Sequence, residues 1–250
     1  MTDTALSSGN FNIQFDYRFD TNGFFNDPNR RAVLESAATV WENIIKDEFT
    51  NVPIGTSLYV ENPQTITFAQ FASDYEIDDL VVFVGARSID GPGGATSDGG
   101  PSATYNIGTS LDTRYSSSNN FEPWTGSISF DTSEPWFFDT TPDTSNDIPV
   151  TEIDFLSTAV HELGHVLGIT SGINAFSSLT SSGYFNGSNA KALNGGNPIP
   201  LSPDLNHVQD GFLVAGVGPE AAMDPSIVAG VRKLPTPLDI ALLVDIGYQV

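Results

Sequence analysis

Apolar and polar residues follow regular patterns in several stretches of the first half of the chain. FNIQFDYRF at residues 11–19 alternates as a half-buried strand does, and RRAVLESAATVWENII at 30–45 repeats its apolar residues at the spacing of a helix that lies across a sheet. DDLVVFVGAR at 78–87 has a continuous apolar centre, which predicts an interior strand buried on both faces. GSISFDT at 126–132 alternates again, and we interpret it as an edge strand.

Two helices are predicted in the second half of the chain. Thr151 with Asp154 has the spacing of a capping box and predicts a helix from about Thr151 to Gly168. Beyond Gly168 the chain becomes rich in Ser, Gly, Asn and Pro, which is typical of irregular structure. TPLDIALLVDIGY at 236–248 then starts with a Thr-Pro pair that favours a helix N-terminus. Strands and helices in this order indicate an α+β fold.

Charge and composition narrow the range of partners. Nine Lys plus Arg against 31 Asp plus Glu give a net charge of −22, which disfavours nucleic acid and acidic lipid. The absence of cysteine excludes disulfides and thiol chemistry. No apolar run reaches the roughly 18 residues of a membrane-spanning helix, and the opening MTDTALSSGN lacks the basic and apolar regions of a signal peptide. We therefore expect no nucleic-acid or membrane partner, and an export signal that was removed, lies outside these residues, or never existed. We also expect a monomer.

AVHELGHVLGITSG at residues 159–172 contains candidate metal chemistry. At about 100° per residue, His161 and His165 lie together on the side of the predicted helix opposite its apolar arc, one turn apart. Two imidazoles at this spacing can bind one metal ion, and Glu162 can stand beside that ion as a general base. An accidental helical pattern is the alternative. Because two histidines make only half of a tetrahedral site, a third ligand is required.

The residues after this pair make the motif resemble that of the metzincin zinc endopeptidases. Gly168 lies three residues after His165 and completes H-E-x-x-H-x-x-G, in which the glycine lets the helix end in a sharp turn. In the short metzincin motif a third His or Asp ligand follows three residues later. That position is Ser171 here, and a neutral hydroxyl is a poor zinc ligand.

His207, in LSPDLNHVQDG, is the remaining histidine of the chain. Some metzincins, the leishmanolysin-like group among them, carry an insertion between the helix and the third histidine. The resemblance therefore implies a zinc site made by His161, His165 and His207, with the fourth position left to water. A surface role for His207, with Asp204 or Asp210 as the ligand, is the alternative.

EAAMDPSIV at residues 220–228 resembles the metzincin Met-turn, a tight turn that places a methionine beneath the metal. The resemblance assigns that role to Met223. An ordinary core methionine is the alternative.

Two further stretches resemble the calcium-binding segments of matrixins, one group of metzincins. IDGPGG at residues 89–94 is similar to their calcium loop, and GSISFDTSEPW at 126–136 is similar to their edge strand. The resemblance carries candidate calcium binding to Asp90, Gly91, Gly93, Asp131 and Glu134. A hydrated acidic loop is the alternative. Matrixins also hold a structural zinc with histidines near these loops, and this chain has no histidine there.

The resemblance extends over nearly the whole chain and implies one catalytic domain of residues 1–250. Its zincin-like N-terminal lobe, residues 11–168, would contain a twisted, mostly parallel sheet with an edge strand and the active-site helix. The irregular C-terminal lobe, residues 169–250, would carry His207, the Met-turn and the last helix.

The function that the resemblance implies is that of a secreted zinc endopeptidase. Its edge strand would hold an extended protein or peptide substrate, and Glu162 would act as general base on metal-activated water. Tyr184 and Tyr248 either assist the oxyanion or are packed aromatic residues. A non-catalytic metal-binding adhesion module and a zinc hydrolase with a non-peptide substrate are the competing functions.

Overall fold

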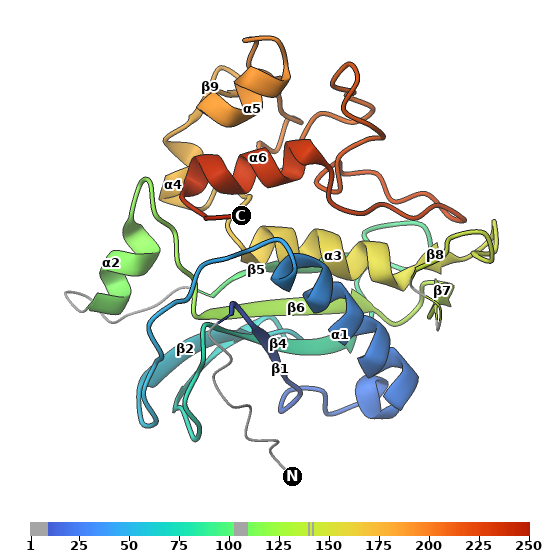
Figure 1. The fold of residues 1–250 in the computed structure, drawn as a ribbon. Coiled ribbons are helices and arrows are strands. Elements are labelled where there is room, and N and C mark those ends of the chain that lie inside the picture. Colours follow the sequence, from blue (N-terminus) through green and yellow to red (C-terminus); the bar gives the residue numbers. More distant parts are fainter. Residues whose placement is uncertain (1–9, 103–109, 140, 142) are drawn as a thin grey trace.

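A four-stranded sheet with strand order β1-β4-β6-β5 forms the lower layer of the molecule in Figure 1. The computed structural model describes residues 10–102, 110–139, 141 and 143–250. The strands of the sheet are β1 (Ile13–Asp16), β4 (Leu80–Arg87), β6 (Thr125–Asp131) and β5 (Ser97–Pro101). The first three run parallel, and β5 pairs antiparallel with β6 at the open edge. The mostly parallel sheet agrees with what the resemblance implied, and the buried central strand β4 agrees with the sequence pattern.

The edge strand is β5, so the prediction that residues 126–132 form the edge is wrong. Those residues form β6, which is buried along its whole length between β4 and β5. Its Ile128 and Phe130 face the main core, while Ser127 and Ser129 are buried on the other face. Apolar and polar residues do alternate along β6, but both of its faces are buried and neither faces solvent.

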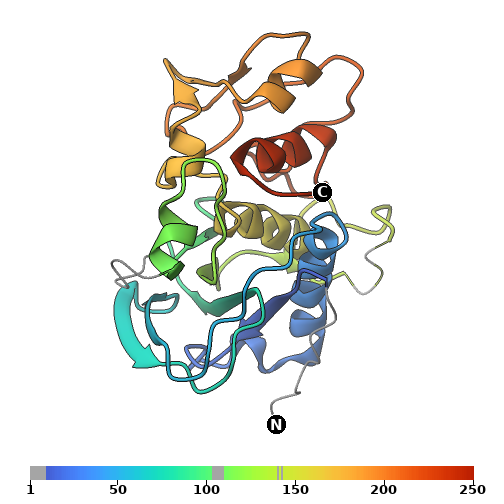
Figure 2. The same ribbon diagram turned by 60° about the vertical axis from the view of Figure 1, so that its left-hand side comes forward.

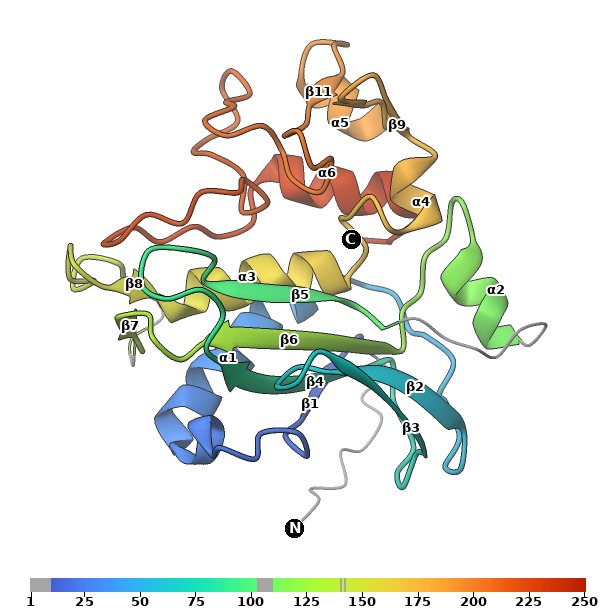
Figure 3. The same cartoon turned by 180° about the vertical axis from the view of Figure 1, so that it is seen from behind.

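An antiparallel hairpin of β2 (Ser57–Asn62) and β3 (Thr67–Ala72) accounts for this cover (Figure 3). The strand β2 packs against β4 and β6, on the face away from the long helices. A second, smaller core forms there from buried apolar residues of these strands and their connections: Val52, Leu58, Val60, Ile77, Val81, Phe83 and Trp124. The sequence pattern did not predict this hairpin.

The helices α1 (Pro28–Glu42) and α3 (Phe155–Val166) pack against each other on the opposite face of the sheet (Figure 1). The helix α1 begins earlier than predicted, because Asp27 caps it and Pro28 occupies its first turn, and it ends at Glu42 instead of Ile45. Its Trp41 is fully buried, and the indole Nε1 donates a hydrogen bond of 3.0 Å to the carbonyl of Val160. This bond ties α1 to the middle of α3.

The helix α3 starts later than predicted, so the prediction of a start near Thr151 is wrong. Ile153 and Asp154 form the short strand β8 (Ile153–Asp154), which pairs with β7 (Trp136–Phe137). Asp154 is the residue that caps α3, and its carboxylate accepts a hydrogen bond from the Ser157 amide. The helix ends at Val166 and the chain turns at Gly168, where φ is 104°. All twelve residues of α3 are buried, because the C-terminal part of the chain covers the face opposite the sheet.

Short elements and loops make up most of the C-terminal part, which lies above α3 in Figures 1 and 2. They are α4 (Asn174–Ser177), β9 (Thr180–Ser181), β10 (Tyr184–Phe185), α5 (Ser188–Leu193) and β11 (Ile199–Pro200). The last helix, α6 (Pro237–Ile246), begins at the Thr-Pro pair, as predicted, and Thr236 also forms a capping box with Asp239. The remaining elements are a 3₁₀ turn, η1 (Phe24–Asn26), and α2 (Ser110–Ser116). None of the helices in the described ranges has the length and apolar character needed to cross a bilayer.

Candidate metal centre

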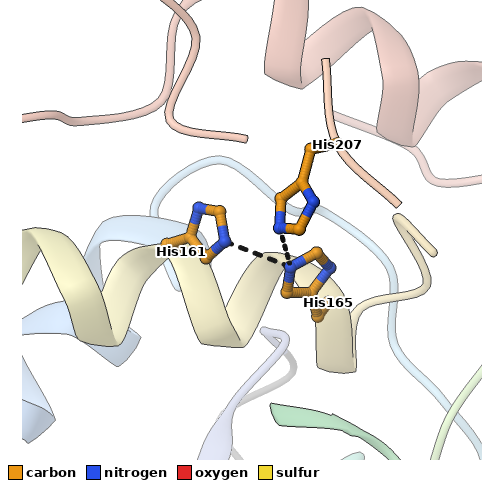
Figure 4. A group of neighbouring side chains, drawn as sticks. All are labelled: His161, His165 and His207. Atoms are coloured by element: carbon orange, nitrogen blue, oxygen red, sulfur yellow. Dashed lines mark hydrogen bonds between the residues drawn. The ribbon is translucent and has the colours of Figure 1, made fainter. Parts of the chain in front are cut away.

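The three histidines of the chain meet above the C-terminal half of α3 (Figure 4). His161 and His165 project from successive turns of α3, and His207 comes from the loop after β11. The Nε2 atom of His165 lies 3.1 Å from Nε2 of His161 and 3.1 Å from Nε2 of His207. Ligand nitrogens around a tetrahedral zinc are about 3.3 Å apart when each is about 2.0–2.1 Å from the metal. The spacing therefore fits a zinc ion.

Each imidazole is oriented by an acceptor at its other nitrogen. His161 Nδ1 lies 2.8 Å from the carbonyl of Ala222, and His165 Nδ1 lies 2.8 Å from the carbonyl of Ile169. Since a carbonyl oxygen only accepts, each Nδ1 carries the proton and each Nε2 presents a lone pair. Burial lowers the pKa of His161 and His165 to about 4, so both rings are neutral at physiological pH. Lone pairs that converge in this way repel one another unless a cation lies between them.

His207 is the most accessible of the three, with 18% of its side chain exposed. Its Nδ1 lies 2.8 Å from a carboxylate oxygen of Asp204. Asp204 therefore orients His207 from the side away from the other rings. Asp210, the other alternative ligand, accepts a hydrogen bond from Ser226 and is not in the histidine cluster.

Ser171 supports the loop of His207 and does not face the cluster. Its hydroxyl donates to the Asn206 side-chain oxygen at 2.7 Å, and its amide donates to the same oxygen at 3.0 Å. Ser171, at the third-ligand position of the short motif, thus holds Asn206, the residue before His207.

A cleft of about 330 Å³ opens beside the histidines. It is lined by residues 94–99 of β5 and the turn before it, by α3, and by loop residues Thr170, Asn206, His207, Pro225 and Ile227. Glu162 lines this cleft, and only 4% of the residue is exposed. Burial raises the pKa of Glu162 above its ordinary value. An acid-base group therefore stands beside the three lone pairs, along the open edge of the sheet.

Met223 packs against the histidine-bearing helix at Gly164 and is fully buried. It belongs to a tight turn in which the Asp224 amide donates to the Ala221 carbonyl at 3.1 Å. A side chain at Gly164, between the two histidines, would overlap the Met223 sulfur. Gly164 therefore makes room for the side chain of Met223.

Asp239 of α6, which the sequence analysis did not single out, supports this turn. Its buried carboxylate accepts hydrogen bonds of 2.9 Å from the amides of Ala222 and Met223. The carbonyl of Ala222 in turn holds His161. In the sequence, Asp239 could have been noticed by its capping-box spacing from Thr236. That spacing does not reveal that the same carboxylate also binds the amides of Ala222 and Met223.

The five candidate calcium residues lie in one region, between the loop after β4 and the end of β6. The Asp131 carboxylate accepts hydrogen bonds from the amides of Ile89 and Asp90, and Glu134 Oε1 accepts from the Gly93 amide at 2.7 Å. Burial raises the pKa of Asp131, but bonds from Ser133 and the backbone outweigh it and hold the pKa below its ordinary value. The carboxylates thus bind backbone amides, and no calcium-type cluster of acids occurs here among the described residues.

Neither tyrosine that was considered for the oxyanion lines the cleft. Tyr248 is 3% exposed and packs against Phe49, which agrees with a packed aromatic residue. Tyr184 is 45% exposed on β10, so it is neither packed nor at the site.

Comparison with known families adds one match. A matrixin family model matches residues 108–185, less than one third of the chain. These residues include β6 and the whole of α3, and they end before His207 and Met223. No curated protein sequence matches the chain significantly. The family match supports a metzincin-type domain of the metallopeptidase kind.

Proposed function

We propose that this domain is a zinc-dependent endopeptidase that cleaves extended protein or peptide substrates. The convergence of three Nε2 lone pairs beside the Glu162 carboxylate, in a cleft along an open sheet edge, carries the proposal. His161, His165 and His207 would hold the zinc ion. Nothing among the described residues favours a non-catalytic module or a non-peptide substrate.

The open edge of β5 is suited to bind the substrate by strand addition. The Thr96 carbonyl and the Ser102 amide bond to β6, at both ends of β5. Because antiparallel pairing alternates, the main-chain groups of Ser97 and Gly99 face away from β6. An extended peptide that pairs with these two residues would lie along the cleft, with a peptide bond next to Glu162.

Glu162 would carry the proton transfers of the reaction. Bound zinc supplies Lewis acidity, which polarises the peptide carbonyl and makes water more acidic. The Glu162 carboxylate accepts the proton of the attacking water and delivers it to the amine that leaves. Burial raises the pKa of Glu162, so its carboxylate is a stronger base toward the attacking water than a fully exposed carboxylate is.

Several finer assignments belong to the same proposal. The Ala221–Asp224 turn with Met223 would be a Met-turn, and the residues between α3 and His207 would be an insertion of the leishmanolysin-like kind. Calcium would bind at Asp131 and Glu134, where Glu134 Oε2 is buried and has no hydrogen-bond partner among the described residues. The domain would act outside the cell as a monomer.

Substitution of Glu162 by glutamine tests the proposal. Glu162→Gln is expected to keep one zinc per chain and the parent melting temperature, but to lose nearly all cleavage of an unfolded protein substrate, because an amide cannot accept the proton. Zinc analysis and a casein-type assay on the same preparation measure both. Parent-like cleavage by the variant, or a parent protein that binds zinc but cleaves no unfolded substrate, would refute the function.

A further inference from the structure

A hydroxyl group from the substrate-binding edge contacts the carboxylate of Glu162. Ser97 Oγ donates a hydrogen bond of 2.6 Å to Glu162 Oε1, from the first residue of β5 to the middle of α3. Glu162 is 4% exposed, so most of its side chain is enclosed by protein. The bond joins residues that are 65 positions apart in the chain.

The second oxygen of Glu162 faces a glycine of the same strand. A Cβ atom on Gly99 would lie 2.7 Å from Glu162 Oε2 and 3.0 Å from Glu162 Cβ. Because side chains alternate along a strand, Ser97 and Gly99 belong to the same face of β5. This face therefore offers a donor to one carboxylate oxygen and leaves space for the other.

The main chain of Ser97 has a different environment from its side chain. The Thr96 carbonyl accepts from the Asp131 amide at 2.8 Å, which directs the amide and carbonyl of Ser97 away from β6 and toward the open edge. A substrate strand that pairs with β5 would contact the residue whose hydroxyl holds Glu162.

We propose that Ser97 is a positioning residue for Glu162, an inference that rests on the proposed function. The bond from Ser97 Oγ holds Oε1 and thereby directs Oε2 into the cleft, where the substrate and the attacking water meet. A glutamate side chain has three rotatable bonds, and holding one oxygen removes most of its alternative orientations. Pairing of the substrate with Ser97 would stabilise β5 and hence the orientation of the base.

Three variants of the full chain separate this role from a general effect on the strand. Ser97→Ala removes the hydroxyl and keeps the main chain, whereas Ser97→Thr keeps a hydroxyl donor at the same carbon. Ser102→Ala is the matched control, because Ser102 directly follows β5, is buried, and has no partner for its hydroxyl among the described residues.

We expect Ser97→Ala to lower kcat by about tenfold, as for the loss of a hydrogen bond to an ionised group. KM should stay within about twofold, because the groups that pair with substrate are intact. Ser97→Thr should retain kcat within about threefold, and Ser102→Ala should match the parent in both constants. Zinc content should be the same in all four proteins. A crystal structure of Ser97→Ala should show Glu162 in more than one orientation.

Other outcomes would overturn the inference. Unchanged kcat in Ser97→Ala, an equal loss in Ser102→Ala, or a loss of zinc in Ser97→Ala would each exclude a role through Glu162. An equal loss in Ser97→Thr would show that the hydroxyl is not what matters. If the parent cleaves no substrate, the proposed function fails. The crystal structure of Ser97→Ala still tests whether Ser97 positions Glu162, and an unchanged orientation of Glu162 would refute that role.

Discussion

Asp204→Ala is expected to weaken zinc binding without abolishing it. The Asp204 carboxylate has one oxygen 2.8 Å from His207 Nδ1, while its other oxygen accepts bonds of 2.9 Å from the Ser202 hydroxyl and the Asn206 amide. It therefore determines both the direction of the imidazole and the shape of the loop that carries it. The side chains of Ala222 and Ile169 have no such role, since backbone carbonyls orient the other two rings.

The magnitude follows from the position of Asp204 behind the ligand. Removal of the carboxylate that orients a metal-binding histidine costs about ten- to a hundredfold in affinity, or about 1.4–2.7 kcal/mol. His207 is partly exposed, so water can replace the lost acceptor at Nδ1. We therefore expect the lower half of that range.

Competition with a chromogenic chelator at fixed pH and ionic strength measures the effect. Asp210→Ala is the matched control, because it removes a carboxylate three residues after His207 that bonds Ser226 and no histidine. It should bind zinc as the parent does. Two results would refute the reasoning: parent-like affinity in Asp204→Ala, or a loss as large as that of His207→Ala, which would make Asp204 a ligand itself.

Three further predictions follow from other contacts. His207→Ala should weaken zinc binding by roughly a hundredfold or more, whereas Ser171→Ala should change it by less than about threefold, and the reverse order in the same chelator titration would overturn the assignment of the third ligand. Calcium at a hundredfold excess over its dissociation constant should stabilise the folded domain by about 2.7 kcal/mol if it binds at Asp131 and Glu134. Thermal melts with fixed zinc test this, and a rise that persists in the Asp131→Asn, Glu134→Gln double variant would exclude the site. Burial raises the pKa of Asp79 to about 6 from its ordinary 3.8. The stabilisation of the folded state by protonation of Asp79 is therefore complete below pH 3.8 and is lost as pH rises through 6. In urea unfolding, the free energy of unfolding of the parent should fall by about 2–3 kcal/mol between pH 4 and 7 because of Asp79, and Asp79→Asn should lack this fall. Parallel pH curves for parent and variant would contradict the prediction.

The elements with strong apolar periodicity could be predicted from the sequence. The strand β4 and the helix α1 each lie within three residues of their predicted bounds, because burial of their apolar residues dominates their local energetics. The strand β5 could not be predicted, since Ser97–Pro101 contains two glycines and a proline and carries no apolar pattern. It forms because β6 offers main-chain groups on that side, a tertiary cause that no local pattern contains.

Some residues of the candidate metal centre could also be predicted from the sequence, and others could not. His161 and His165 could be recognised because helical spacing alone brings them together. His207 was assigned through the resemblance to metzincins that carry an insertion, together with its being the remaining histidine of the chain. Its contact with Asp204 was not predicted, since Asp204 was considered only as an alternative ligand. The hydroxyl of Ser97 could not be assigned, because its proximity to Glu162 depends on how β5 and α3 pack.

The meeting of His165 with His207 has a consequence for the topology of the chain. The two residues are 42 positions apart, and the chain contains no cysteine with which to form a disulfide. A metal ion held by both would cross-link the polypeptide and close that loop in the folded state. For a permanent cross-link of this length, the loss of entropy from the unfolded chain corresponds to about 4 kcal/mol. A chelator would then act on this domain as a reducing agent acts on a disulfide-bonded one, and the segment between the two histidines would lose its tether first.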